Sequence, residues 1–270
     1  MHPILIRIGP LTIHTYGFLF ALGVLLAILL CFRLARREGV DTKIFIDFVF
    51  YALLLSLLGA KLVLLVTNLN YYLAYPEELK YLLTSGGTFY GGLIFGALFG
   101  IWFIRRHRLS YRQLGDIIGP GLALGHFFGR LGCFTAGCCF GRYCGASPLG
   151  VTFTDPYAHR LTGVPLDIPI YPTQLAEAAL NLINFIFLFF LFRRRRFSGQ
   201  VFIFYVLNYA LIRFVVEYFR GDPDRGYVFG GTGHPFSSLS LPQLISVIGV
   251  AVALVLWKIF ARKSEKKSRP

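Results

Sequence analysis

Seven long apolar stretches dominate the chain, and short polar or glycine-rich segments separate them. The stretches cover residues 16–32, 44–66, 89–104, 117–134, 175–192, 201–219 and 241–260. Most approach the roughly 20 apolar residues that an α-helix needs to cross the hydrocarbon core of a bilayer. The pattern predicts an all-α polytopic membrane protein with seven transmembrane helices. Because no repeat or Pro/Ser-rich linker interrupts it, residues 1–270 are expected to form a single membrane domain.

Charge gives this predicted bundle a direction. Only 15% of the residues are charged and 56% are hydrophobic, yet Lys and Arg outnumber Asp and Glu by 27 to 13. The basic residues gather just after the first, third, fifth and seventh stretches, at 33–37, 105–112, 193–196 and 258–269. Cytoplasmic loops carry such an excess. We therefore expect an outside N-terminus, a cytoplasmic C-terminus and outer loops at 67–88, 135–173 and 220–240; a nucleic-acid partner is not expected.

Arg213 and Glu217 lie inside the sixth apolar stretch. Each such ion costs about 2.5–3.5 kcal/mol on insertion scales unless it is paired or faces a polar cavity. Their i, i+4 spacing places them on one helix face, so they could form an ion pair that holds helices together. Arg130, beside Gly129 at the end of the fourth stretch, is a second guanidinium suited to a bidentate phosphate contact. Together these residues predict a pocket for an anion.

Two neighbouring features have both a structural and a functional interpretation. His126 lies one helical turn before Arg130 and is either hydrogen-bonded structure or a proton-transfer group. Tyr90, Gly91 and Gly92 open the third stretch. Small residues there let helices approach closely, while exposed backbone N–H groups at a helix start bind anions.

Four of the five cysteines, Cys133, Cys138, Cys139 and Cys144, fall within twelve residues, from the end of the fourth stretch into the outer loop 135–173, with the spacing C-x4-C-C-x4-C. On an oxidising face of the membrane this favours a disulfide, with the pairing open. A metal site is less favoured, because the spacing lacks the C-x2-C pair of zinc ligands and no nearby histidine completes a set.

Six short motifs, taken in order, give the chain a family resemblance. They are IHTYG at residues 13–17, GAKL at 59–62, YGGLI at 90–94, ALGHFFGRLG at 123–132, YPTQL at 171–175 and RFVVEYFRGDP at 213–223. Each is weak alone, but their order is specific. Along nearly its whole length the chain resembles the prolipoprotein diacylglyceryl transferases of bacterial inner membranes.

The resemblance implies an enzyme that moves the diacylglyceryl group of phosphatidylglycerol to the lipobox cysteine thiol of a prolipoprotein. A thioether forms and glycerol phosphate leaves, which is the first step of lipoprotein maturation. The implied partners are phosphatidylglycerol, the prolipoprotein signal peptide and membrane lipids, with no cofactor and no metal. A monomer in the inner membrane, with its active site toward the outer face, is expected.

The site residues follow from the residues and the resemblance together. The expected catalytic residues are Arg130, Arg213, Glu217, His126 and Tyr90. The expected residues of the lipid or substrate site are Tyr16, Gly91, Gly92, Gly129, Arg130, Gly141, Gln174 and Arg220.

The chain also departs from the family pattern. Tyr90 stands where the family usually has histidine, and Cys133, Ala136 and Cys138 replace polar residues. We hypothesise that His126 takes over proton handling and that disulfides hold the loop. Three alternatives stay open: a related lipid transferase with a different acceptor, a membrane thiol-redox protein using residues 133–144, and a non-catalytic binder of anionic lipid.

Overall fold

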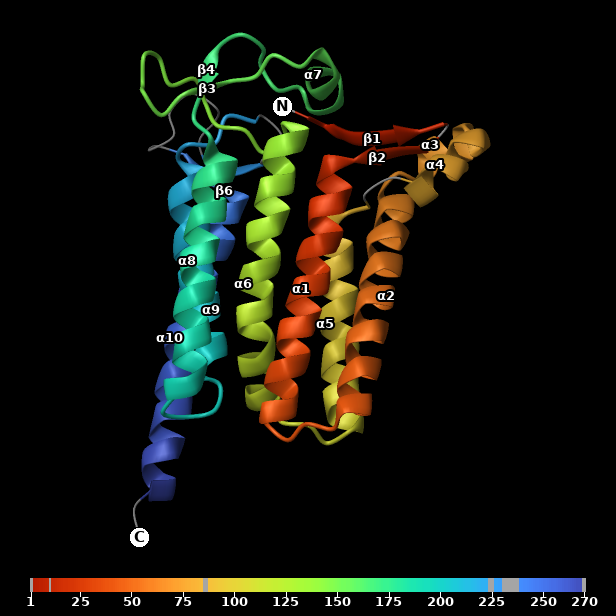
Figure 1. The fold of residues 1–270 in the computed structure, drawn as a ribbon. Helices are drawn as coiled ribbons and strands as arrows, with labels where there is room; N and C mark the ends of the chain where they lie inside the picture. Colours follow the sequence, from red (N-terminus) through yellow and green to blue (C-terminus); the bar gives the residue numbers. More distant parts are fainter. Residues whose placement is uncertain (1, 10, 85–86, 223–225, 230–237, 269–270) are drawn as a thin grey trace. The chain divides into compact units, whose positions relative to one another are not determined.

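The computed structural model describes residues 2–9, 11–84, 87–222, 226–229 and 238–268 (Figure 1). The chain divides into two compact units. The first comprises Met1–Cys31 and Gly115–Pro270, and the second comprises Phe32–Leu114. Each is described by itself below, and the single membrane domain over residues 1–270 stays a prediction.

Long helices form most of the first unit: α1 (Thr15–Arg37, which runs on into the second unit), α6 (Tyr111–Ala136), α8 (Thr173–Arg194), α9 (Gln200–Glu217) and α10 (Leu241–Ser268). Helix α9 packs between α8 and α10, and the three lie side by side in Figure 1. The buried stripe of α8 is polar in its first half and apolar in its second. Its polar members are Thr173, Gln174, Glu177, Asn181 and Asn184. Polar side chains inside a helical bundle mark a site or an interhelical hydrogen-bond network.

A buried carboxylate fixes the start of α9. Asp116 of α6 accepts hydrogen bonds from the backbone N–H of Gly199 at 2.7 Å and of Phe202 at 3.1 Å. Its Oδ2 also lies 3.5 Å from Nε of Arg195. These bonds satisfy backbone donors that a helix start leaves without partners. Asp116 therefore acts as an N-terminal cap supplied by a neighbouring helix.

The second unit is a helix pair with a short helical excursion. Helices α2 (Thr42–Thr67) and α5 (Phe89–Arg106) pack on each other, and between them lie α3 (Leu69–Ala74), a 3₁₀ turn η1 (Pro76–Glu78) and α4 (Leu79–Thr84). A Cβ added at Gly91 would lie 2.5 Å from the carbonyl oxygen of Gly59, and one at Gly96 would lie 2.3 Å from Oγ of Ser56. The glycines of α5 thus allow the close helix approach that small residues permit.

Among the described residues, six helices are long and apolar enough to cross a membrane: α1, α2, α6, α8, α9 and α10. The chain is therefore an all-α polytopic membrane protein, as predicted. The third predicted stretch, 89–104, forms helix α5 of 18 residues but is not among these six. Most of the helices extend beyond the predicted stretches, because the polar and basic residues at their ends continue the helix. Helix α6, for example, begins at Tyr111 rather than at residue 117.

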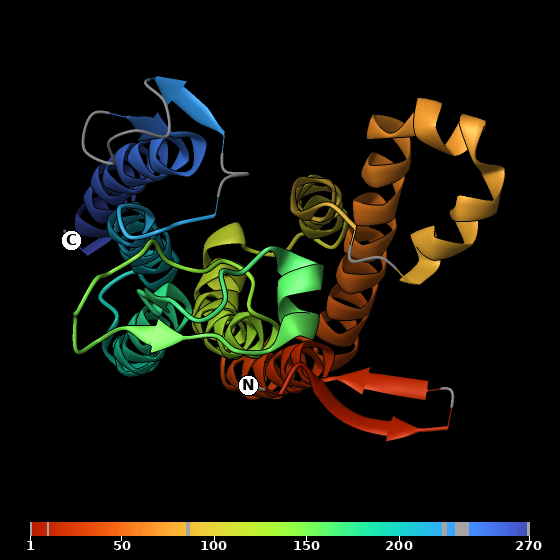
Figure 2. The same cartoon turned by 90° about the horizontal axis from the view of Figure 1, so that it is seen from above.

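The loops add three small antiparallel ribbons: β1 (Ile4–Ile8) with β2 (Leu11–His14), β3 (Val151–Thr152) with β4 (Pro169–Ile170), and β5 (Tyr227–Phe229) with β6 (Leu239–Ser240). The predicted outer loop 135–173 has its own small core, formed by Phe140, Phe153, Ala158, Val164 and Ile170. It also contains α7 (Pro156–Thr162), which Asp155 caps. This loop lies over the ends of α6 and α8 (Figures 1 and 2).

Candidate active site

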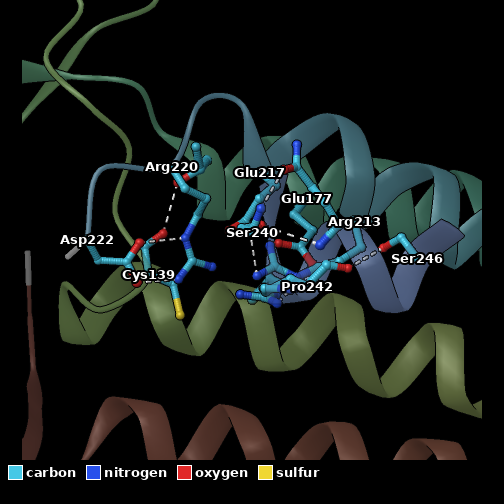
Figure 3. A network of polar contacts seen from close by, with 12 residues as sticks. Cys139, Glu177, Arg213, Glu217, Arg220, Asp222, Ser240, Pro242 and Ser246 are labelled. Atoms are coloured by element: carbon cyan, nitrogen blue, oxygen red, sulfur yellow. Dashed lines mark hydrogen bonds and ion pairs between the residues drawn. The ribbon is translucent and has the colours of Figure 1, made fainter. Parts of the chain in front are cut away.

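Three arginine–carboxylate pairs gather in the first unit where α6 and α9 end and α8 begins. Nη2 of Arg130 lies 2.9 Å from Oε1 of Glu177, which joins α6 to α8. Nη2 of Arg213 lies 2.8 Å from Oε2 of Glu217, one turn further along α9. Figure 3 shows Glu177, Arg213 and Glu217 directed toward one another. The intramembrane ion pair expected at Arg213 and Glu217 is therefore formed.

Burial makes these pairs obligatory. The side chains of Glu177 and Glu217 are each 1% exposed, and those of Arg130 and Arg213 are 17% and 16% exposed. A carboxylate removed from water to this extent needs a cationic partner. In turn, each carboxylate fixes the orientation of a guanidinium group.

Several buried polar atoms in this region have no hydrogen-bond partner within the described part of the chain. They are Nη1 of Arg213, Oε1 of Gln174, Oδ1 of Asn181, Nδ2 of Asn184 and Nδ1 of His126. Buried polar groups are normally satisfied by protein or ordered water, so each such atom calls for an explanation. These atoms belong to α6, α8 and α9, the helices that also carry Arg130, Glu177 and Arg213, and a hydrogen-bonding ligand or ordered water would satisfy them.

His126 lies on α6 one turn before Arg130, as expected. The centroid of its ring lies 4.5 Å from that of Tyr209, with the two planes tilted by 37°, and 6.2 Å from that of Tyr205, both on α9. Arg130 also interacts electrostatically with Tyr209. His126 therefore shares its aromatic neighbour with the arginine of the anion site.

Arg220 follows the end of α9 and is held by Asp222. Its Nε donates to Oδ1 of Asp222 at 2.6 Å, and Nη2 contacts Oδ2 (Figure 3). Burial acts to lower the pKa of Arg220, but the hydrogen bond to Asp222 and the negative charges of Cys139, as a thiolate, and of the Asp222 carboxylate outweigh it and raise the pKa overall. Arg220 therefore stays protonated in its buried position.

Gly141 and Gln174 hold the loop that crosses this site. The backbone N–H of Gly141 donates to the carbonyl of Tyr171 at 3.1 Å, and a Cβ at residue 141 would lie 2.2 Å from that oxygen. The side-chain amide of Gln174 donates to the carbonyl of Cys138 at 2.9 Å. Only glycine fits at residue 141. The hydrogen bonds of Gly141 and Gln174 together bind the loop to the start of α8.

The remaining expected residues occupy different surroundings. Tyr16 of α1 packs against Gly132 of α6, where its Cδ2 would lie 3.0 Å from an added Cβ. Space beside Gly129 is open, with nothing within 4 Å of an added Cβ. Tyr90, Gly91 and Gly92 belong to the second unit, where Gly91 and Gly92 face α2. For these two glycines the geometry favours the helix-packing interpretation.

The five cysteines are free thiols in this structure. The sulfur atoms of Cys133, Cys138 and Cys139 lie within 4.8 Å of one another. Hydrogen bonds from Cys133 and Cys138, together with the positive charges of Arg220 and Arg130, lower the pKa of Cys139 against the opposing effect of burial. The disulfide expected from the spacing stays a prediction.

Sequence reasoning missed two members of the site. Glu177 is not among the site residues expected from the sequence, but it pairs with Arg130 across two helices. Asn184 accepts a hydrogen bond from Asn208 of α9 at 2.9 Å. The signal was present, because polar residues repeat every three or four positions through the fifth apolar stretch, and this repeat marks a polar helix face.

Comparison with known proteins identifies the family of the chain. The family model described as prolipoprotein diacylglyceryl transferase matches residues 3–259. The chain belongs to the prolipoprotein diacylglyceryl transferase family. It is therefore a transferase from a family of multi-pass membrane proteins that act in lipoprotein biosynthesis, and the resemblance seen in the motifs is confirmed.

Individual members of the prolipoprotein diacylglyceryl transferase family match along almost their full length. A phosphatidylglycerol–prolipoprotein diacylglyceryl transferase of Clostridium tetani is 32% identical over 96% of this chain and 98% of its own length. Similarly named proteins of Bordetella avium and Geobacter sulfurreducens are each 33% identical. The Bordetella match covers 98% of this chain and 97% of the relative, and the Geobacter match covers 95% and 96%.

Proposed function

We propose that this transferase moves the diacylglyceryl group of phosphatidylglycerol to the lipobox cysteine thiol of a prolipoprotein. The observation that carries the proposal is the buried Arg130–Glu177 and Arg213–Glu217 cluster, in which Nη1 of Arg213 lacks a partner among the described residues. A phosphate diester offers the acceptor oxygens that such a guanidinium donor would bind.

The chemistry uses these donors as the leaving group forms. The thiolate sulfur attacks the glyceryl carbon next to the phosphate, a C–S bond forms, and the C–O bond to phosphate breaks. The phosphate gains one negative charge as it leaves in glycerol phosphate. Oriented donors in a dry site stabilise such developing charge more strongly than the ground state. Arg130 and Arg213 supply them, and Glu177 and Glu217 hold them in place.

The attacking thiol must first lose its proton, because the thiolate is the nucleophile. His126 is our candidate for the acceptor, since its Nδ1 is buried without a hydrogen-bond partner in the described part and lies one turn from Arg130. A His126→Asn protein that folds but has lost turnover would support this role. Full activity in that variant would contradict it, and Tyr90→Phe tests the other expected acceptor in the same assay.

The membrane arrangement forms part of the proposal. We infer seven spans, with α5 as the third along the chain, an outside N-terminus and a cytoplasmic C-terminus, because basic runs follow every odd-numbered stretch. The arginine cluster then lies toward the outer face of the bacterial inner membrane. Phosphatidylglycerol, the prolipoprotein signal peptide and surrounding lipids are the expected partners of a monomer.

A reconstituted assay tests the reaction. Purified protein is incubated with phosphatidylglycerol and a lipobox peptide, and peptide mass and released glycerol phosphate are followed beside an Arg130→Ala control. The proposal requires a diacylglyceryl peptide from the wild type and almost none from the control. Product from phosphatidylethanolamine but not phosphatidylglycerol would reassign the lipid, and a modified peptide lacking the lipobox cysteine would reassign the acceptor.

A further inference from the structure

A cluster of three thiols lies beside the proposed active site and has no role in the reaction above. It consists of Cys133 in the last turn of α6 and Cys138 and Cys139 just beyond it. Their sulfur atoms all lie within 4.8 Å of one another. We refer to these three residues as the thiol triad.

The local backbone builds the triad. Gly137 has φ of 81° and ends α6 with a left-handed turn that brings the chain back toward Cys133. Cys139 has φ of 59°, a conformation that costs a non-glycine residue about 1–2 kcal/mol. Hydrogen bonds of 2.9 Å from Gln174 to the Cys138 carbonyl and from Thr173 to the Cys139 carbonyl hold this turn. Neighbouring structure thus keeps the three sulfurs together before any ligand arrives.

Charge around the triad favours thiolate ligands. Arg220 and Arg130 both act electrostatically on Cys139, and Figure 3 shows the Cys139 sulfur next to the Arg220 guanidinium. Three thiolates around a monovalent cation carry two net negative charges. Arg130 and Arg220 are themselves paired with Glu177 and Asp222, so they stabilise thiolate ligands only in part, and the choice of cation depends on the number and softness of the ligands.

We propose that the thiol triad is a binding site for one soft, thiophilic monovalent cation of the Cu⁺ class. Soft thiolates select Cu⁺, zinc and iron–sulfur clusters among biological metals. Structural zinc sites almost always have four ligands, whereas the described residues bring only these three donors together. Cu⁺ accepts three sulfur ligands. Each S–Cu bond replaces a thiol proton, which passes to solvent, and no electron is transferred.

Such an ion would tie together the elements that hold the active site. Residues 140–142 are hydrogen-bonded to segments on both sides. The Gly141 N–H donates to the carbonyl of Tyr171, just before α8. After α9, the carbonyl of Phe219 accepts from the Arg142 N–H, and the Gly221 N–H donates to the carbonyl of Phe140. Linking Cys133 to Cys138 and Cys139 would fix this loop on the end of α6, the helix of Arg130. Bound metal should therefore stabilise the fold, since a ligand that binds only the native state raises its apparent stability.

The first test is competition for Cu⁺ by the purified full-length chain, kept reduced and free of oxygen. Cu⁺ is supplied as its complex with a coloured chelator, and the loss of colour gives stoichiometry and affinity. We expect one equivalent bound by the wild type and by Cys144→Ser, a matched control in the same loop. Cys133→Ser, Cys138→Ser and Cys139→Ser should each bind at least ten-fold more weakly. Wild-type affinity in the triad variants, or an equal loss in Cys144→Ser, would refute the site.

Three further measurements do not depend on the folding of variants. X-ray absorption of the Cu⁺-loaded wild type should show three sulfur neighbours, and nitrogen or oxygen neighbours in their place would overturn the proposal. One equivalent of Zn²⁺ bound more tightly than Cu⁺ would overturn the choice of cation. A disulfide between two triad cysteines, found by mass spectrometry of protein taken unreduced from membranes, would replace the metal site with the covalent link expected from the spacing.

Discussion

At the scale of single residues, the site depends on charges that cannot be separated from their partners. Arg213 and Glu217 were predictable as a pair because i, i+4 residues share a helix face. Arg130 and Glu177 were not, because their pairing depends on how α6 packs on α8, which periodicity does not specify. The thiol triad was also missed, since spacing suggested bonds between cysteines and not a turn that gathers three sulfurs.

Removing one partner of the Arg130–Glu177 pair should destabilise the fold more than removing both. Arg130→Gln strands a carboxylate that is 1% exposed, and breaking a buried pair costs about 3–5 kcal/mol. In Arg130→Gln/Glu177→Gln no unpaired charge remains. Thermal denaturation in detergent should therefore show partial recovery of stability in the double variant, while turnover stays lost. Recovery of turnover as well would mean that the pair has only a structural role.

At the scale of elements, glycines allow helices to pack closely and capping residues fix where helices begin. Apolar periodicity predicted the long helices well, but it could not predict that Asp116 of α6 caps α9, because that contact joins distant segments. The glycine-rich start of α5 left two interpretations open from sequence. Only the packing of Gly91 against Gly59 favours one of them.

Replacing the cap should weaken α9 without touching the chemistry. Asp116→Ala removes the carboxylate that accepts from two backbone N–H groups and contacts Arg195, and losing a cap costs about 0.5–2 kcal/mol. Asp41→Ala is the matched control, because Asp41 caps α2 at an exposed position. We expect a clearly lower melting temperature for Asp116→Ala, a smaller change for Asp41→Ala and normal turnover of folded protein in both. Equal effects would show that burial of the cap adds nothing.

A methyl group at residue 141 should displace the loop from α8. The added Cβ of Gly141→Ala would meet the Tyr171 carbonyl at 2.2 Å, whereas nothing lies within 4 Å of one added at Gly125. Turnover should therefore fall at least ten-fold in Gly141→Ala and remain near the wild-type value in Gly125→Ala. Unchanged kinetics in Gly141→Ala would show that the loop does not position the site.

At the scale of the whole molecule, hydropathy identified the membrane class and the family motifs indicated the transferase. Six described helices meet the length and composition of a span, and α5 ends in Arg105 and Arg106. Whether the bundle has seven spans depends on how α5 sits in lipid, which the apolar pattern of one segment does not determine. Orientation likewise comes only from the distribution of basic residues.

The topology prediction can be tested with single cysteines in a chain whose native cysteines are replaced by serine. A membrane-impermeant maleimide applied to intact spheroplasts should label a cysteine placed at Glu77, in the predicted outer loop 67–88. It should label one placed at Glu38 or Arg196 only after the membrane is permeabilised. Labelling of all three positions, or of Arg196 alone, would contradict an outside N-terminus with seven spans.

The most direct test of the central claim is the rate of thioether formation by Arg213→Lys compared with the wild type. The claim is that paired guanidinium groups stabilise the phosphate as it leaves. Lysine keeps the positive charge but loses the paired N–H donors of the guanidinium group. We therefore expect kcat to fall at least ten-fold, equivalent to about 1.4 kcal/mol of transition-state stabilisation, while KM for phosphatidylglycerol changes little. An unchanged kcat, or a change confined to KM, would contradict the claim.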